Sequence, residues 1–283
     1  MKIRKINKLK IIRLSLSIII TALLTAFFLD LEKILPYQIH SIAHLQIVPA
    51  ILSAMSGEIK ALLIILILIL LFGRFYCSVI CPLGVLQDFI TWISKKINKK
   101  KRFNYTKSFN IIRYIFLIIM VITLVFGIGG ILAFIEPYSI YGRVVTHLFK
   151  PIVIAINNIL ASFFEWTKDY YFREFEISII STFSFIIAAI SFVIVAIFSF
   201  VNGRKFCNVI CPVGAILNIL SRASLFKIRI DKEKCNSCGL CEFSCKAGCI
   251  NSKEKNIEVG NCVVCFNCIG KCNKGSIKYK IRN

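Results

Sequence analysis

Acidic residues are scarce in this chain, with 14 Asp and Glu against 36 Lys and Arg, so the formal net charge is +22. Histidine is scarcer still, and His40, His44 and His147 all lie outside the apolar runs, which argues against a bis-histidine haem in a membrane. No C-x-x-C pair is followed by His and no G-x-G-x-x-G loop is present, so we expect neither c-type haem nor a nucleotide. The basic residues form blocks between apolar runs, which membrane topology explains more simply than nucleic-acid binding.

Long apolar runs dominate the chain, in which 57% of the residues are hydrophobic. A transmembrane helix needs about 20 apolar residues. Four runs approach or exceed that length, at residues 14–31, 61–86, 111–134 and 179–201. The first is too long for the apolar core of a signal peptide, so we predict four transmembrane helices. Arg74 is the only charge in the second run, and we expect its head group to reach the membrane interface.

The basic blocks predict the orientation of these helices. Residues 1–13 carry six Lys and Arg and residues 95–107 carry seven, with no acid in either block. Residues 135–178 carry four basic and five acidic residues, as an outside loop would. Cytoplasmic loops are enriched in Lys and Arg. We therefore predict a multi-pass protein of the bacterial cytoplasmic (inner) membrane, with both termini in the cytoplasm, where free thiolates and clusters persist.

Eight of the 13 cysteines form two equivalent runs near the C-terminus, each with the spacing C-x2-C-x2-C-x3-C. In this pattern three cysteines hold one iron–sulfur cube and the fourth ligates the other cube. The prediction is one [4Fe-4S] cluster on Cys235, Cys238, Cys241 and Cys272, and a second on Cys262, Cys265, Cys268 and Cys245. A zinc site would use two separated pairs, and a disulfide framework would not repeat one run twice.

Cys249 is an additional cysteine between the two runs. It is either a spare thiol beside the second cluster, a substitute ligand, or a small buried apolar residue, the commonest state of a lone cysteine. The sequence leaves these alternatives open.

The segments GRFYCSVICPLG at 73–84 and GRKFCNVICPVG at 203–214 are near copies, and each follows an apolar run that returns to the cytoplasm. The chain therefore consists of two similar units in the same orientation, as in parallel-repeat membrane proteins. Cys77 and Cys81 are spaced to share one helix face, as are Cys207 and Cys211. Pro82 and Pro212 break the helix directly after each pair.

Related by a twofold axis, the two pairs would bring Cys77, Cys81, Cys207 and Cys211 together as a third metal or cluster site. Alternatively each pair is a redox-active dithiol, or a packing element at a helix end. Arg74 and Arg204 either offset thiolate charge or follow the general excess of basic residues on the cytoplasmic side.

The C-terminal runs resemble those of bacterial two-cluster ferredoxins, although Lys246 and Asn273 stand where Pro usually follows the fourth cysteine. The whole chain, with its twin C-x3-C-P motifs, resembles the NapH/MauN-type membrane ferredoxin proteins, and related membrane modules occur in NosR and CcoG. The expected fold is an all-α bundle of four transmembrane helices (residues 1–221) with a C-terminal α+β ferredoxin domain that holds two [4Fe-4S] clusters (residues 222–283).

The resemblance implies electron transfer between membrane quinol and a partner redox protein, and leaves open whether the chain is a quinol dehydrogenase subunit. A second hypothesis is an accessory factor that uses its clusters in maturation or regulation of another redox complex. A third, a transporter, is weakened by the absence of acids deep in the spans. His40, His44 and His147 are predicted on the outer side and are candidates to accept a quinol proton.

Overall fold

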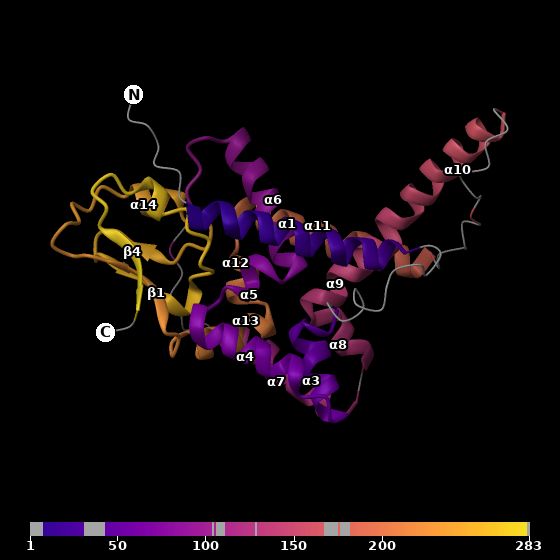
Figure 1. Ribbon diagram of the computed structural model, residues 1–283, viewed down its shortest axis with the longest axis horizontal. Helices are drawn as coiled ribbons and strands as arrows, with labels where there is room; N and C mark the ends of the chain where they lie inside the picture. The colour runs from indigo at the N-terminus through magenta and orange to yellow at the C-terminus, as the bar shows by residue number, and fades with distance from the viewer. Residues whose placement is uncertain are drawn as a thin grey trace.

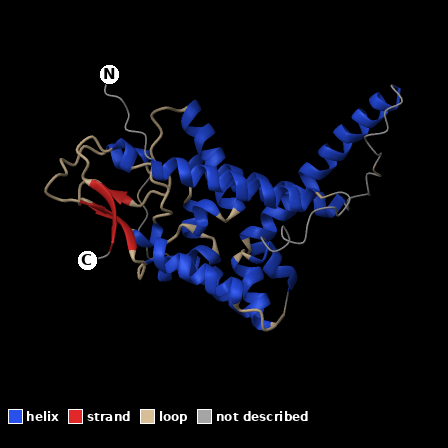
Figure 2. Ribbon diagram, viewed as in Figure 1, coloured by secondary structure: helices blue, strands red, loops and turns tan. Residues whose placement is uncertain are grey.

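The computed structural model describes residues 8–30, 43–103, 105, 111–127, 129–166, 175 and 182–281. Helices make up the described chain as far as residue 221, and strands occur only in the C-terminal part (Figure 2). The strand-containing part lies at one end of the long axis, and α10 projects from the other end (Figure 1).

The first half of the helical part contains α1 (Lys8–Leu29), α3 (Ile47–Met55), α4 (Lys60–Phe72), α5 (Tyr76–Val79) and α6 (Pro82–Ile97). The second half contains α7 (Ile111–Val125), α8 (Gly129–Ile135), α9 (Pro137–Val144), the π-helical turn η1 (Val145–Phe149), α10 (Lys150–Trp166), α11 (Thr182–Asn202), α12 (Lys205–Val209) and α13 (Pro212–Ser221).

Among the described residues, three helices are long and apolar enough to cross a membrane: Lys8–Leu29, Pro137–Phe163 and Thr182–Asn202. The first and last correspond to the first and fourth predicted spans. The second and third predicted spans form the shorter apolar helices α4 and α7. The part of the chain that the structure describes therefore has membrane-type helices, and a set of four spans stays a prediction.

Where we expected an outside loop at residues 135–178, the structure has a helix over 137–163 that is long and apolar enough to cross a membrane. The charge count over that segment was misleading because its charges are unevenly spread. Between residues 137 and 163 only Arg143 and Lys150 are charged, and the remaining charges follow residue 164 apart from Glu136. Glu136 caps the start of α9 by accepting a 2.8 Å hydrogen bond from the backbone N–H of Ser139, which satisfies one of the free N–H groups there.

The two halves pack through equivalent contacts. Helix α6 of the first half packs on α11 of the second, and α13 of the second packs on α4 of the first. Helix α1 packs on α5 and α6 as α7 packs on α12 and α13. Each half therefore buries its helix after the C-x3-C-P motif against the other half, so the two motifs meet in the interior.

Each motif contains a sharp chain reversal. Pro82 and Pro212 occupy the first turn of α6 and α13, where a missing N–H costs nothing. A residue before Pro avoids the helical region, so Cys81 and Cys211 are extended (φ −73° and −64°). The two cysteines of a motif therefore do not share one continuous helix face, which corrects the prediction from their spacing.

The C-terminal part is a small α+β unit. Strand β1 (Phe226–Ile230) pairs antiparallel with β4 (Ile277–Ile281), with Ile228 opposite Tyr279, and β2 (Ile250–Asn251) pairs with β3 (Asn256–Ile257). Short helices complete it: α14 (Leu240–Ser244), η2 (Val259–Asn261) and η3 (Ile269–Lys271). Because β1 and β4 are neighbours, the two cysteine runs are closed into one compact unit next to the helical part.

Glycine at the fourth position of C-P-x-G permits the reversal, and this is testable. A Cβ on Gly84 or Gly214 would lie 2.2 or 2.1 Å from the carbonyl oxygen of Cys77 or Cys207, closer than any real contact. We expect Gly84→Ala and Gly214→Ala each to destabilise the protein by about 1–3 kcal/mol or more, as overpacking does. Thermal unfolding in detergent measures this. Gly130→Ala is the control, because a Cβ there meets nothing within 4 Å; equal melting of all three variants would contradict the assignment.

Candidate metal centres

One cavity in the C-terminal unit, the outer cavity, is lined by four of the predicted ligands. These are Cys235, Cys238, Cys241 and Cys272, with Ser252, Lys274 and Ser276 beside them. Cys238 is exposed and Cys241 is buried. The structure thus brings together three cysteines of the first run and the fourth cysteine of the second.

A second cavity, the inner cavity, is lined by the complementary set Cys245, Cys262, Cys265 and Cys268, together with Cys249. Its remaining walls are aliphatic: Ala247, Ile228, Ile250, Ile257 and Val263. All of these aliphatic residues are at least 93% buried. The inner cavity is therefore enclosed by buried apolar residues, and the outer one is open to solvent at Cys238.

The loops around both cavities direct backbone N–H groups at cysteine sulfur. Cys245 interacts with the backbone N–H groups of residues 247–249, and Cys272 with those of residues 274, 276 and 277. Ser237, Val264 and Phe266 adopt positive φ (55°, 51° and 59°), which is rare for such residues and marks tightly wound loops. Hydrogen bonds to sulfur are a feature of iron–sulfur sites, so the donor set and the loop geometry both fit a cluster in each cavity.

Two side chains play equivalent parts four residues after the last cysteine of each run. The Cys249 Sγ lies 3.6 Å from the Cys245 Sγ, and the Ser276 Oγ lies 3.0 Å from the Cys272 Sγ. The hydrogen bond with Cys249, opposed by burial, lowers the pKa of Cys245 to about 6. Burial raises the pKa of Cys272, but the bonds to Ser276 and nearby backbone outweigh it and lower that pKa. Both cysteines are thus prepared for the thiolate form that a metal requires.

The cysteines of the C-x3-C-P motifs form a third group in the helical interior. Cys77, Cys81, Cys207 and Cys211 are each at most 5% exposed. Every pair among the four interacts electrostatically, so all four sulfurs lie in one neighbourhood. In the described chain, no group of three or more His, Cys, Asp or Glu is arranged to hold a single metal ion, and this applies to the three cysteine groups alike.

Two arginines cross between the halves beside these cysteines. Arg204 Nη1 donates to the carbonyl of Cys77 (2.7 Å), and Arg74 Nη2 donates to the carbonyl of Cys207 (3.2 Å). Both are fully buried. Arg74 therefore does not extend to the membrane interface as predicted, because protein carbonyls rather than water satisfy its head group. Its Nη2 also lies 3.8 Å from Cys77 Sγ, in favour of the charge-offset alternative.

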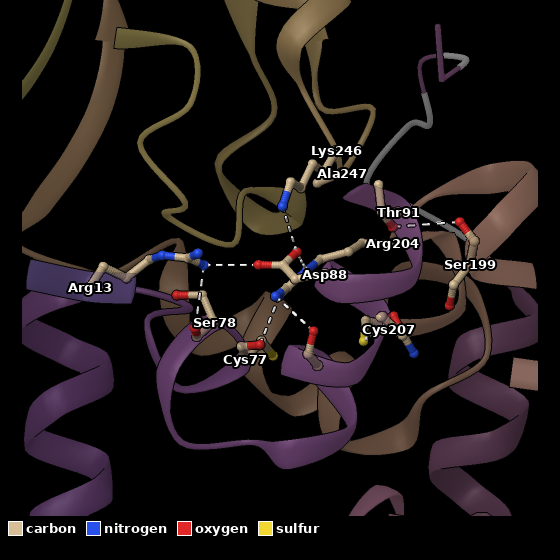
Figure 3. Close-up of polar contacts among 12 residues, drawn as sticks. Arg13, Cys77, Ser78, Asp88, Thr91, Ser199, Arg204, Cys207, Lys246 and Ala247 are labelled. Carbon is tan, nitrogen blue, oxygen red and sulfur yellow. Dashed lines mark hydrogen bonds and ion pairs between the residues drawn. The ribbon is translucent and has the colours of Figure 1, made fainter. Parts of the chain in front are cut away.

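Asp88 on α6 is the feature that sequence analysis missed. Its carboxylate pairs with Arg204 (2.7 Å), Arg13 (3.0 Å) and Lys246 (3.4 Å), which come from three separate segments (Figure 3). Burial raises the pKa of Asp88, but these three cations hold it well below its usual range. The available signal was that Asp88 is the only acid between Glu58 and Glu136.

Asn208 and Arg204, both in the second C-x3-C-P segment, attach the C-terminal unit to the helices. Asn208 Nδ2 donates to the carbonyls of Ala247 (3.1 Å) and Asn261 (3.3 Å), on the loops that follow Cys245 and precede Cys262. Arg204 N–H donates to the carbonyl of Lys246 (3.0 Å). The inner cavity is thereby held directly against the two C-x3-C-P motifs.

The histidines are not brought together with the cysteines. His44 is bonded to Ser53 (3.1 Å), and His147 lies in η1 inside the long helix over 137–163, with its Nδ1 buried and without a hydrogen bond. His147 is therefore part of a membrane-type helix rather than an outside loop. His40 lies outside the described residues.

Cysteine-lined cavities that fit iron–sulfur clusters, in a chain with membrane-type helices, define a membrane iron–sulfur protein. The chain matches the family described as "4Fe-4S binding domain" over residues 59–100 and 184–232. These similarities support a 4Fe-4S ferredoxin-type protein of the NapH/MauN type, which confirms the resemblance seen in the sequence.

Three relatives illustrate the similarity. An uncharacterized protein of Methanocaldococcus jannaschii is 25% identical over 77% of this chain and 68% of its own length. The ferredoxin-type protein NapH of Haemophilus influenzae is 22% identical over 79% and 68%. The methylamine utilization ferredoxin-type protein MauN of Methylobacillus flagellatus is 23% identical over 61% and 48%. No solved structure matches the chain.

Asp88→Asn tests the buried ion cluster. Removing the charge leaves Arg13, Arg204 and Lys246 without their common carboxylate, and breaking a buried pair typically costs about 3–5 kcal/mol. We expect a large drop in the melting temperature and faster proteolysis between the helices and the C-terminal unit. Asp231→Asn is the control: Asp231 pairs with the exposed Lys234 at 3.7 Å, and such pairs contribute about 0–1 kcal/mol. Equal stability of both variants would disprove the role of Asp88.

Cys249→Ala and Ser276→Ala test the donors beside the last cysteines. A hydrogen bond to a ligand sulfur stabilises the more negative, reduced state, so its loss lowers the reduction potential. Redox titration followed by EPR should show a more negative potential for the inner cluster in Cys249→Ala and for the outer cluster in Ser276→Ala. Cys249→Ser keeps a donor and should stay near wild type. Loss of the inner cluster from Cys249→Ala would instead identify Cys249 as a ligand.

Proposed function

We propose that this protein is a membrane-bound electron carrier between the quinol pool and a partner redox protein, with two [4Fe-4S] clusters. The proposed ligands are Cys235, Cys238, Cys241 and Cys272 for the outer cluster and Cys262, Cys265, Cys268 and Cys245 for the inner one. The observation that carries the proposal is that each cavity takes three cysteines from one run and the fourth from the other, which is the two-cluster arrangement.

A bound cluster supplies one-electron chemistry, and the chain's part is to place it and set its surroundings. The inner cavity is enclosed by aliphatic side chains and held against the helices by Asn208 and Arg204. The outer cavity opens to solvent at Cys238. The proposed electron path therefore runs from the membrane to the inner cluster, then to the outer cluster and the partner.

The arrangement of the basic segments supports a common side for the clusters and the basic blocks. Lys95, in the block at 95–107, donates to the carbonyl of Phe243 in the C-terminal unit (2.9 Å). The start of α1 lies at the same end of the molecule as this unit (Figure 1). By the positive-inside rule we assign that side to the cytoplasm, with a membrane domain over 1–221 and a ferredoxin domain over 222–283.

The rim of the outer cavity suits an acidic redox partner. Lys234, Lys271 and Lys274 are exposed around it, and Leu240 on its wall is 41% exposed. Charged rims chiefly steer association, and a central apolar contact adds affinity. On the membrane side, His147 is our candidate to accept a quinol proton, because it lies in the apolar helix over 137–163 and its buried Nδ1 has no hydrogen bond.

Two variants in proteoliposomes test the order of the clusters. Cys268→Ala removes an inner ligand and Cys241→Ala removes an outer one. With a short-chain quinol as reductant, visible bleaching should persist in Cys241→Ala, because the inner cluster still receives electrons. In Cys268→Ala the EPR signal of the reduced outer cluster should not appear with quinol, because the inner cluster that supplies its electrons is missing, but it should appear with dithionite.

The wild type and Cys249→Ser are the controls, and both should bleach with quinol. Reduction of the outer cluster of Cys268→Ala by quinol at the wild-type rate would overturn the proposed order. A wild-type protein whose clusters dithionite reduces but quinol does not would exclude the carrier function and favour the accessory one.

A further inference from the structure

The four cysteines of the C-x3-C-P motifs are left without a role by two ferredoxin clusters. Neither half of the chain can complete a four-cysteine site alone, because each motif supplies only two thiols. Arg74 of the first half donates to the carbonyl of Cys207, and Arg204 of the second half donates to the carbonyl of Cys77. These two hydrogen bonds bring the two cysteine pairs together. The site thus exists only because the two halves pack on each other.

The buried positive charge of Arg74 beside these cysteines is the second observation that supports a metal site. Arg74 is fully buried, and its hydrogen-bond partners are neutral oxygens (Asn208 Oδ1 at 2.6 Å, Gly260 O at 2.9 Å, Cys207 O at 3.2 Å) and the sulfur of Cys77. In the described chain it forms no ion pair with a carboxylate. A buried charge is tolerated when it is paired. The partner that remains for Arg74 is negative charge on the cysteines.

Two buried hydrogen-bond donors without an acceptor also indicate negative charge at these cysteines. Arg74 Nε and Gln87 Nε2 are buried and have no hydrogen-bond acceptor. Gln87 also lies against this group, because its Oε1 accepts from the Cys207 thiol at 3.2 Å. Buried donors normally have acceptors. Four neutral thiols or two disulfides would leave the guanidinium and these donors uncompensated, whereas metal-bound thiolates with inorganic sulfide would compensate both.

The identity of the group follows from the spacing and the sequence match. The four sulfurs interact mutually but are not arranged for a single metal ion, a property that they share with the two ferredoxin cavities. The two segments that match the 4Fe-4S binding family, 59–100 and 184–232, each contain one C-x3-C-P motif and end before Cys235. The match of both segments to a 4Fe-4S binding family favours an iron–sulfur centre over zinc.

We propose that Cys77, Cys81, Cys207 and Cys211 jointly ligate a third [4Fe-4S] cluster, with Arg74 as its buried counter-charge. The inference deepens the proposed function, on which its role as an electron relay rests. Arg74 also donates to the carbonyl of Gly260, two residues before the inner ligand Cys262. The third cluster therefore lies next to the inner cavity, between it and the membrane helices.

Metal analysis of anaerobically purified, detergent-solubilised protein tests the proposal. Iron and acid-labile sulfide should each approach about twelve per chain, the content of three cubes, instead of about eight. Cys77→Ala combined with Cys207→Ala should lower both counts by about four and leave the EPR signals of the two ferredoxin clusters. Ile80→Val combined with Ile210→Val, which alters both motifs between their cysteines without removing a thiol, is the matched control and should keep the full count.

A second measurement does not depend on removing ligands. Arg74→Gln should shift the midpoint potential of the additional EPR signal to a more negative value, because a buried positive charge stabilises the reduced state. Arg74→Lys should shift it less. The size-exclusion profile and the ferredoxin EPR signals report whether each variant is folded.

The outcomes separate this inference from the proposed function. About eight irons in the wild type, unchanged in the double variant, would overturn the third cluster and leave the carrier intact. One zinc per chain that disappears with Cys77 and Cys207 would also overturn it. Quinol-inactive protein with about twelve irons would overturn the carrier function and leave the third cluster standing.

Discussion

Burial of guanidinium groups between two repeated halves is the constraint on which the structure depends. Arg74 and Arg204 each leave their own half and bind the cysteine turn of the other. A guanidinium carries its charge at any physiological pH, so burial cannot be relieved by losing a proton. Its donors must be satisfied by fixed acceptors, and the acceptors here are carbonyls of a chain reversal. The charge therefore specifies both the docking of the halves and the shape of each cysteine turn.

The same constraint connects the membrane helices to the C-terminal unit. Asp88 receives cations from α1, from the start of α12 and from the loop after Cys245, while Arg74 binds the loop before Cys262. The ferredoxin loops thus complete the polar interior of the helical part. Because buried polar networks are costly when incomplete, the inner cavity is held in a fixed position relative to the membrane helices, as electron transfer over a defined distance requires.

The sequence predicted which cysteines of the two C-terminal runs lie together better than it predicted the helices. Spacing alone placed the fourth cysteine of each run with the opposite set, because short loops leave few ways to arrange three consecutive ligands. The helix over 137–163 was missed because charge was averaged over a segment whose acids lie mainly beyond residue 164. Cys81 was placed on a helix face by counting residues, although Pro82 forces it into an extended conformation.

Other features depend on tertiary contacts that no local pattern contains. Arg74 looked like an interfacial residue in an apolar run, and only the packing of the halves shows that its partners are carbonyls 133 and 186 residues away. The role of Asp88 likewise depends on cations from three distant segments. The repeat did indicate that the two motifs are equivalent, and the structure shows what that equivalence builds.

The equivalence is incomplete at one position. Asn218 stands in the second half where Asp88 stands in the first, seven residues after the corresponding cysteine. Asn218 donates to Asn261 and accepts from Arg222, whereas Asp88 pairs with three cations. A symmetric dimer of two first halves would enclose two carboxylates, and one of two second halves would enclose none. The two repeated halves are thus complementary at this position, because only the first carries the buried carboxylate that the three cations share.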